Sequence, residues 1–235
     1  MNSFRLTVLL LLLSITNPIF SQQNLNSQFT IVVDAGHGGK DPGNTGNGYL
    51  EKKIALSIAL KLGKKLEDNG VKVVYTRKSD VFVNLFERAN IANRSNAQLF
   101  ISIHCDSHTS QAYGAGTFVL GLHANQRNFE VAKKENSVIF FEEDYINKYE
   151  GFDPNNPESV IGLTLMQEEY LDQSIIAASY IQNSFVNKLK RRNRTVKQAG
   201  FIVLKYTYMP SVLVETGFLT NNSEGAYLNS VRGQK

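Results

Sequence analysis

The segment IVVDAGHGGKDPG, residues 31–43, joins an apolar, β-branched run to a glycine-rich loop. Short apolar runs of this kind are typical of buried strands, so we expect a strand over residues 29–34. His37 follows in the loop, whose glycines allow a tight fold without side-chain clashes. The segment therefore predicts a buried strand that delivers a histidine at its end.

Helix and strand signals alternate through the rest of the chain. Apolar residues at every fourth position predict a helix over 50–68, which Asn69 and Gly70 end. Asn84 and Glu87 resemble a capping box that opens a helix through about Arg94. The further strands that we expect are 71–76, 98–104, 115–120, 201–205 and 211–215. This order favours a single α/β domain, with a twisted, mostly parallel sheet of about six strands flanked by helices.

Roughly eighty residues separate the fourth predicted strand from the last two, which is far longer than an ordinary loop. Residues 159–192 predict a long helix, and the basic cluster at its end suits the helix dipole. Residues 121–157 predict a helical insertion on the scaffold.

The first 21 residues have the pattern of a secretory signal peptide. Arg5 precedes the apolar run Leu6–Ile15, which is too short to span a membrane, and cleavage is expected near Ser21. An uncleaved anchor is the alternative. We therefore expect an exported catalytic domain over 22–235, in the periplasm or at the cell surface, with no membrane span after cleavage.

The bulk composition sets limits on partners and on stabilisation. The chain has 235 residues and a net charge of +4, which is far from the basic stripe of a nucleic-acid-binding protein. Cys105 is its one cysteine, so an internal disulfide is excluded. The fold must rest on its apolar core or on a metal.

Four polar side chains are expected at one edge of the sheet. His37 follows the first strand, His104 ends the third and Glu215 ends the last, while Glu51 begins the helix that returns from the His37 loop. Ligands bind at the carboxyl ends of parallel strands. Two imidazoles and a carboxylate form a typical catalytic zinc site, and a further carboxylate can act as general base.

The spacing of these residues leaves alternatives open. Glu51 could simply interact with the dipole of its helix, and His108 lies close enough to His104 to be a rival ligand. Cys105 should face the core, because neighbours on a strand point to opposite faces.

Four ordered blocks resemble the zinc-dependent N-acetylmuramoyl-L-alanine amidases, septal-type members with a helical insert included. They are DAGHGGKDPGNTG, the following Glu51, YTRKSDVFVNLFERANIANRSNAQLFISIHCDS and SVLVETGFLTN. The resemblance implies Zn²⁺ ligands at His37, Glu51 and His104 and a catalytic glutamate at Glu215. It thereby favours Glu51 over a dipole role and His104 over His108.

The implied reaction is hydrolysis of the amide between N-acetylmuramic acid and L-alanine in peptidoglycan, for wall remodelling or daughter-cell separation. Stem peptides carry carboxylates, so Arg77 and Arg88 are candidate substrate clamps. The alternative, which we favour, is that they pair with Asp80 and Glu87 and hold the loop.

Some members of this family carry an insert that covers the zinc site until a protein activator moves it. By similarity, residues 129–147 are expected to be helical, and Glu135, Glu142 or Glu143 would supply an inhibitory zinc ligand. The alternative is an ordinary surface insertion whose charged side chains are solvated. The family also continues into a closing helix, so we expect this chain to be truncated at its C-terminus.

Two other functions compete with the amidase. The first is another zinc peptidase acting on wall peptides, which is disfavoured because Glu51 does not follow His37 in a His-x-x-Glu pair. The second is a non-catalytic peptidoglycan-binding protein, which is disfavoured because every chemically required side chain is present.

Overall fold

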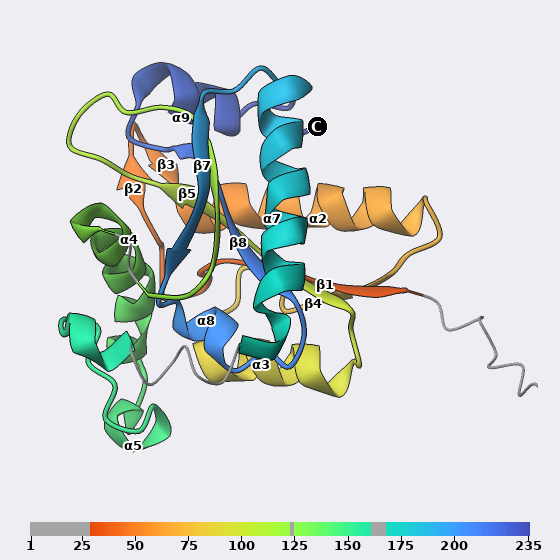
Figure 1. Ribbon diagram of the computed structural model, residues 1–235. Helices are drawn as coiled ribbons and strands as arrows, with labels where there is room; N and C mark the ends of the chain where they lie inside the picture. Colours follow the sequence, from red (N-terminus) through yellow and green to blue (C-terminus); the bar gives the residue numbers. More distant parts are fainter. Residues whose placement is uncertain (1–28, 123–124, 161–167) are drawn as a thin grey trace, which may run out of the picture.

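The computed structural model describes residues 29–122, 125–160 and 168–235 (Figure 1). The signal peptide expected over 1–21 lies outside these residues and stays a prediction. The expected truncation at the C-terminus also stays a prediction. None of the helices in the described ranges is both long and apolar enough to cross a membrane.

A six-stranded sheet forms the centre of the domain, with the order β4-β1-β5-β8-β6-β7. Neighbouring strands are parallel except for β6 and β8, which are antiparallel, so the prediction of a mostly parallel α/β sheet is confirmed. The strands are β1 (Thr30–Ala35), β4 (Lys72–Tyr75), β5 (Leu99–Asp106), β6 (Ala115–Leu120), β7 (Asn193–Ala199) and β8 (Ser211–Phe218). A short hairpin, β2 (Thr45–Gly46) and β3 (Tyr49–Leu50), precedes the first long helix.

Helices cover both faces of the sheet (Figure 1). One apolar core lies beneath α2 (Glu51–Glu67) and α7 (Glu168–Asn187). A second lies on the opposite face, beneath α3 (Leu85–Arg94), α4 (Gln126–Asn136) and α8 (Ile202–Lys205). Strand residues alternate between the two cores, as the period of a strand requires. A last helix, α9 (Asn222–Leu228), contributes Leu228 to a smaller cluster.

The structure corrects the sequence prediction at two neighbouring places. Residues 201–205 were expected to form a strand, but they contain the short helix α8. The sheet instead takes β7, which we did not predict. A short, fully buried apolar run has no periodicity that separates strand from helix, and β7 is a polar strand at the sheet edge.

The expected insertion folds as three short helical segments. They are α4, the 3₁₀ helix η1 (Ser137–Phe141) and α5 (Tyr145–Lys148). A second 3₁₀ helix, η2, covers Pro157–Val160. The long helix predicted over 159–192 is confirmed as α7 over Glu168–Asn187 but is wrong at its ends, because η2 includes residues 159–160 and the basic cluster over 188–192 follows the helix. Arg191 of that cluster pairs with Glu224 and anchors α9.

Candidate metal centre

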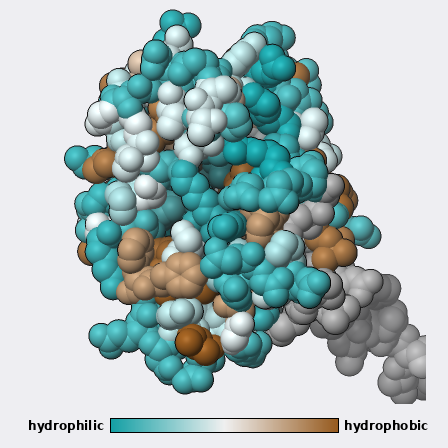
Figure 2. Space-filling model, turned by 90° about the vertical axis from the view of Figure 1, so that its left-hand side faces the viewer, coloured by the Kyte–Doolittle hydropathy of each residue, from teal (hydrophilic) through white to brown (hydrophobic). Residues whose placement is uncertain are grey.

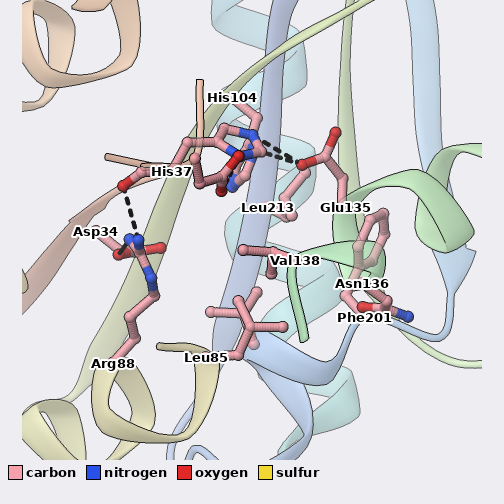
Figure 3. Close-up of a pocket in the computed structure, with 13 residues that line it drawn as sticks. Asp34, His37, Leu85, Arg88, His104, Glu135, Asn136, Val138, Phe201 and Leu213 are labelled. Carbon is pink, nitrogen blue, oxygen red and sulfur yellow. Dashed lines mark hydrogen bonds and ion pairs between the residues drawn. The ribbon is translucent and has the colours of Figure 1, made fainter. Parts of the chain in front are cut away.

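Four buried side chains converge at the carboxyl edge of the sheet. Ligand-type atoms of His37, Glu51, His104 and Glu135 all lie within 4.8 Å of one another. His37 comes from the loop after β1, Glu51 from the start of α2, His104 from β5 and Glu135 from α4. Figure 3 shows both imidazoles directed at the Glu135 carboxylate.

The contacts within this cluster are short. Oε1 of Glu51 lies 3.2 Å from Nε2 of His37 and 3.1 Å from Nδ1 of His104. Oε2 of Glu135 lies 3.0 Å and 2.9 Å from the same two nitrogens. The Glu51 and Glu135 carboxylates therefore both contact the same two imidazole nitrogens.

Glycines of the first loop make room for the two imidazoles. A Cβ atom on Gly36 would lie 2.5 Å from the His104 ring, and one on Gly43 would lie 2.6 Å from the His37 ring. His37 itself has a φ of 60°, a left-handed conformation that few side-chain-bearing residues adopt. The glycine-rich loop is thus required by the close approach of two histidines.

Hydrogen bonds behind the rings orient the two histidines. Nδ1 of His37 lies 2.7 Å from Oδ2 of Asp41, and Nε2 of His104 lies 3.1 Å from the hydroxyl of Ser102. That hydroxyl in turn donates to Asp34 at 2.6 Å. If these outer nitrogens carry the protons, Nε2 of His37 and Nδ1 of His104 are left as lone-pair donors toward the cluster.

Glu51 is held in place by the main chain. Its carboxylate accepts hydrogen bonds from the backbone N–H groups of Cys105 at 2.8 Å and Asn44 at 2.7 Å. Burial alone would raise the pKa of Glu51, but the charge of His37 and the close contacts of both imidazoles hold that pKa below its usual value. Glu51 is therefore a charged carboxylate at neutral pH.

The histidine pKa values move in the opposite direction. Burial lowers the pKa of His104, yet the neighbouring Glu135 and Glu51 carboxylates raise it to about 9. Burial also lowers the pKa of His37, but the Glu51, Glu135 and Asp41 carboxylates raise it well above its ordinary value. Without a metal, the imidazoles therefore hold protons that a metal ion would displace on binding.

The donor set fits a divalent metal. Nε2 of His37 and Oε2 of Glu135 are both buried and lie 3.0 Å apart, yet neither makes a hydrogen bond among the described residues. Buried polar atoms without partners are costly, and a cation between them would satisfy both. Two imidazoles with carboxylates suit zinc and several other divalent ions.

Glu215 lies beside this cluster on β8, paired in register with His104 on β5. Its side chain is buried, and neither carboxylate oxygen has a hydrogen-bond partner among the described residues. Burial raises the pKa of Glu215 well above its ordinary value, and the negative charges of Asp106, Glu135 and Glu51 raise it further. A carboxyl group with a raised pKa is a candidate for taking up and returning a proton.

The other glutamates of the insertion lie away from the cluster. Glu142 is bonded to Lys148 at 2.8 Å and to the Tyr149 hydroxyl at 2.7 Å, and Glu143 is exposed. Among the three predicted candidates, Glu135 alone reaches the histidines. Its place on α4, facing the histidines, separates it from the other two, which follow η1.

The two predicted substrate clamps are buried and support the histidine loop. Arg77 donates hydrogen bonds to the carbonyl oxygens of Ala35, Gly36, Lys52 and Ser79. Burial and the charge of Arg88 lower the pKa of Arg77 to about 10.

Arg88 donates to the carbonyl oxygens of Ala35, His37 and Val83 and pairs with the Asp34 carboxylate at 2.6 Å. The predicted pairing of Arg77 and Arg88 with Asp80 and Glu87 is wrong, because those acids pair with Lys52 and Arg94. That both arginines hold the loop is confirmed. With their donors directed at loop carbonyls, a role as substrate clamps has no support in these contacts.

We expect Asp34→Asn to destabilise the fold by about 3 kcal/mol, because it breaks a fully buried ion pair. Burial raises the pKa of Asp34, but the charge of Arg88 and the hydrogen bonds from Ser102 and Thr76 lower it by more. The net effect is a pKa below the ordinary value. The stabilisation is therefore present above the unfolded pKa of about 3.9 and is lost as the pH falls through the folded pKa. Urea unfolding across this range should show a smaller acid-induced loss in Asp34→Asn than in the wild type.

The rival ligand His108 and the neighbouring Cys105 are both directed away from the cluster. Cys105 is buried in the apolar cluster with Ile54, Leu219 and Leu228, which confirms that it faces the core. The ring of His108 bonds to Ser110, outside the cluster. Neither is among the four convergent residues.

The insertion closes the site from solvent. The cavity beside the histidines has a volume of only about 10 Å³, which is close to the minimum for one water molecule. Figure 2 shows the face that carries α4, η1 and α5, which is largely hydrophilic with small apolar patches, mostly in its lower half. With α4 in this position, both histidines and Glu135 are buried, and Glu135, Asn136 and Val138 of the insertion line the cavity.

Comparisons with known proteins agree with this arrangement. The family model described as N-acetylmuramoyl-L-alanine amidase matches residues 31–235. The amidase AmiA of Escherichia coli K12 is 34% identical over 205 residues, which span 85% of this chain and 69% of AmiA. YqiI of Bacillus subtilis, an uncharacterised protein, is 34% identical over 88% of this chain and 78% of its own length.

Solved structures show the same fold. The N-acetylmuramoyl-L-alanine amidase of Clostridium difficile 630 superposes with a TM-score of 0.65 at 26% identity, over 88% of this chain and 89% of that one. The amidase AmiC2 of Nostoc punctiforme superposes with a TM-score of 0.57 at 29% identity, over 88% of both chains.

Proposed function

This chain belongs to the N-acetylmuramoyl-L-alanine amidase family, and we propose that it cleaves peptidoglycan as a zinc enzyme through His37, Glu51, His104 and Glu215. The family gives the reaction, which is hydrolysis of the amide between N-acetylmuramic acid and L-alanine. The observation that carries the proposed site is the convergence of two imidazoles and Glu51 beside Glu215.

Each residue has a distinct role in the proposed mechanism. Nε2 of His37, Nδ1 of His104 and the carboxylate of Glu51 would hold the ion, which when bound polarises the scissile carbonyl and lowers the pKa of water. Glu215 takes a proton from the attacking water and returns it to the leaving amine of L-alanine. Its burial and raised pKa suit a group that must first accept and then donate that proton.

Metal binding is expected to require both imidazoles. His37→Ala and His104→Ala should each lower zinc affinity by at least 10-fold, whereas His108→Ala should bind like the wild type. Calorimetry in buffers of different ionisation enthalpy should also show proton release, because the displaced protons come from the two histidines. Equal affinity in all four proteins would contradict the assignment.

We propose further that α4 inhibits the enzyme in the closed form. Glu135 contacts the same imidazole nitrogens as Glu51, so it takes the position that a catalytic zinc site keeps open for water and substrate. A solvated surface excursion would not bury a carboxylate against two histidines.

Several contacts hold α4 in this position. Phe129, Val131 and Ala132 are buried on its inner face, and Arg127 pairs with Asp106 at 2.7 Å. Asn136 donates to the carbonyl of Gly200 at 2.7 Å. Opening the site therefore means breaking a defined set of apolar and polar contacts.

Opening is the step at which we propose that a protein activator acts. The rest of the insertion presents exposed apolar side chains, Phe140, Phe141 and Ile146, on which such a partner could bind.

Export to the periplasm or cell surface, which the substrate requires, is part of the same proposal and rests on the signal peptide predicted over 1–21. Roles in wall remodelling or daughter-cell separation follow from it.

A further inference from the structure

A β-bulge in β7 places a second set of charged side chains beside the catalytic glutamate. The register between β6 and β7 shifts from Ala115 opposite Asn193 to Thr117 opposite Val196, so two residues, Arg194 and Thr195, stand opposite Gly116. Thr195 has a φ of 65°, which is a rare conformation for a β-branched residue. Bulges of this kind redirect side chains and are frequent next to active sites.

The bulge and the strand register bring Arg194 and Lys197 toward Glu215. Gly116 of β6 pairs with Glu215 of β8, and Phe118 of β6 pairs with Lys197. A Cβ atom on Gly116 would lie 3.1 Å from Cβ of Arg194 and 3.3 Å from Nζ of Lys197. The absent side chain of Gly116 therefore leaves room for the Cβ of Arg194 and for the Lys197 ammonium on the Glu215 face of the sheet.

Neither cation has a carboxylate partner among the described residues. The Arg194 guanidinium lies over the Phe218 ring at 5.0 Å and donates one hydrogen bond, from Nε, to the carbonyl of Tyr113. The Lys197 ammonium lies over the Phe118 ring at 4.8 Å. By contrast, Arg127 of α4, which stacks on the same Phe218 ring, is paired with Asp106.

The electrostatic setting agrees with an anion site. Burial lowers the pKa of Lys197, while the Asp106 and Glu215 carboxylates raise it and the charges of Arg194 and Arg127 lower it. Three cations thus lie around Asp106 and Glu215, and two of them have donors to spare. Half-buried cations without a partner have a desolvation cost that a bound anion would offset.

We propose that Arg194 and Lys197 form a subsite for a carboxylate of the leaving stem peptide. This proposal rests on the amidase function, because Glu215 protonates the leaving amine and the peptide must therefore extend from its side of the centre. Charged donors beside a stacked aromatic ring suit a carboxylate on a short peptide. Arg77 and Arg88, the arginines that sequence alone singled out for this task, are directed instead at the histidine loop.

The test uses two synthetic muropeptides that differ only in the α-carboxyl group of the second residue, free in one and amidated in the other. The zinc-loaded chain is assayed in its wild-type and Glu135→Ala forms, with Lys197→Met, Arg194→Met and Lys197→Arg added to each. We expect Lys197→Met and Arg194→Met to lower kcat/KM roughly 10-fold for the free acid, mainly through KM, and to leave the amidated substrate unchanged. Lys197→Arg should restore most of the loss.

Lys188→Met, at an exposed position after α7, is the matched control for charge removal. Equal losses on both substrates, or none on either, would overturn the subsite while leaving the amidase function intact. Failure of every form to hydrolyse either muropeptide would instead refute the proposed function and the subsite with it. Thermal unfolding and zinc content, measured on each variant, separate a lost contact from a damaged fold.

Discussion

Glu215→Gln is expected to lower the rate of amide hydrolysis by about 10²–10⁴-fold, the range for removal of a general acid–base group. Glutamine has almost the same shape but can neither accept the proton of the attacking water nor return it to the leaving amine. The wild-type carboxyl is buried without a hydrogen-bond partner among the described residues, so the substitution breaks no observed contact. The fold and the zinc content should therefore be unchanged.

Single-turnover assays with a muropeptide and zinc analysis of the same samples check this expectation. Glu143→Gln, an exposed position on the insertion, is the matched control and should behave like the wild type. Activity of Glu215→Gln within a few-fold of the wild type would show that another group moves the proton.

Glu135→Ala is expected to raise activity roughly 10- to 100-fold, which corresponds to a coupling free energy of about 1.4–2.7 kcal/mol between the closed insertion and the site. The substitution removes the carboxylate that contacts both imidazoles and leaves the apolar face of α4 in place. It is therefore a milder change than deletion of the insertion, which would expose the core beneath α4.

The control for this prediction comes from the same segment. Glu142→Ala and Glu143→Ala remove carboxylates that do not reach the histidines, so neither should raise activity. Initial rates on soluble muropeptides give the comparison. If Glu135→Ala is no faster than the wild type although it binds zinc, α4 does not limit access through its glutamate.

The metal centre could be predicted from sequence because strand ends define it. His37 follows β1, while His104 and Glu215 lie in the second halves of β5 and β8, and parallel strands bring such positions to one edge. Glu51 could not be assigned as a ligand from its position alone, because glutamates are common in the first turn of a helix. Its main-chain partners, which hold it as a ligand, come from distant segments.

Other features depended on packing that a linear pattern does not contain. Glu135 could not be separated from Glu142 and Glu143, because the choice depends on how the insertion folds against the sheet: Glu135 lies on the buried side of α4, whereas Glu142 and Glu143 follow η1. Asp41 and Ser102 were missed as partners of the histidines, although each lies close in sequence to the ring that it orients. Both are short polar residues with many other roles in proteins, so nothing in the sequence distinguishes them as partners of a histidine.

The edge strand β7 shows the limit of hydrophobic patterning. Its sequence, NRTVKQA, has one β-branched apolar residue and follows a basic cluster, so nothing in it stands out as a strand. The neighbouring run FIVLK was taken for that strand because it is apolar throughout. Lys197 and Arg194 were therefore not considered near the site until the sheet order placed them there.

The measurement that tests this account most directly is mass spectrometry of peptides released from isolated peptidoglycan by zinc-loaded Glu135→Ala and by the double variant Glu135→Ala/Glu215→Gln. We predict that the single variant releases stem peptides with a free L-alanine amine and that the double variant releases almost none. Cleavage at another bond, or equal release by both proteins, would contradict a zinc amidase that uses Glu215 and is closed by Glu135.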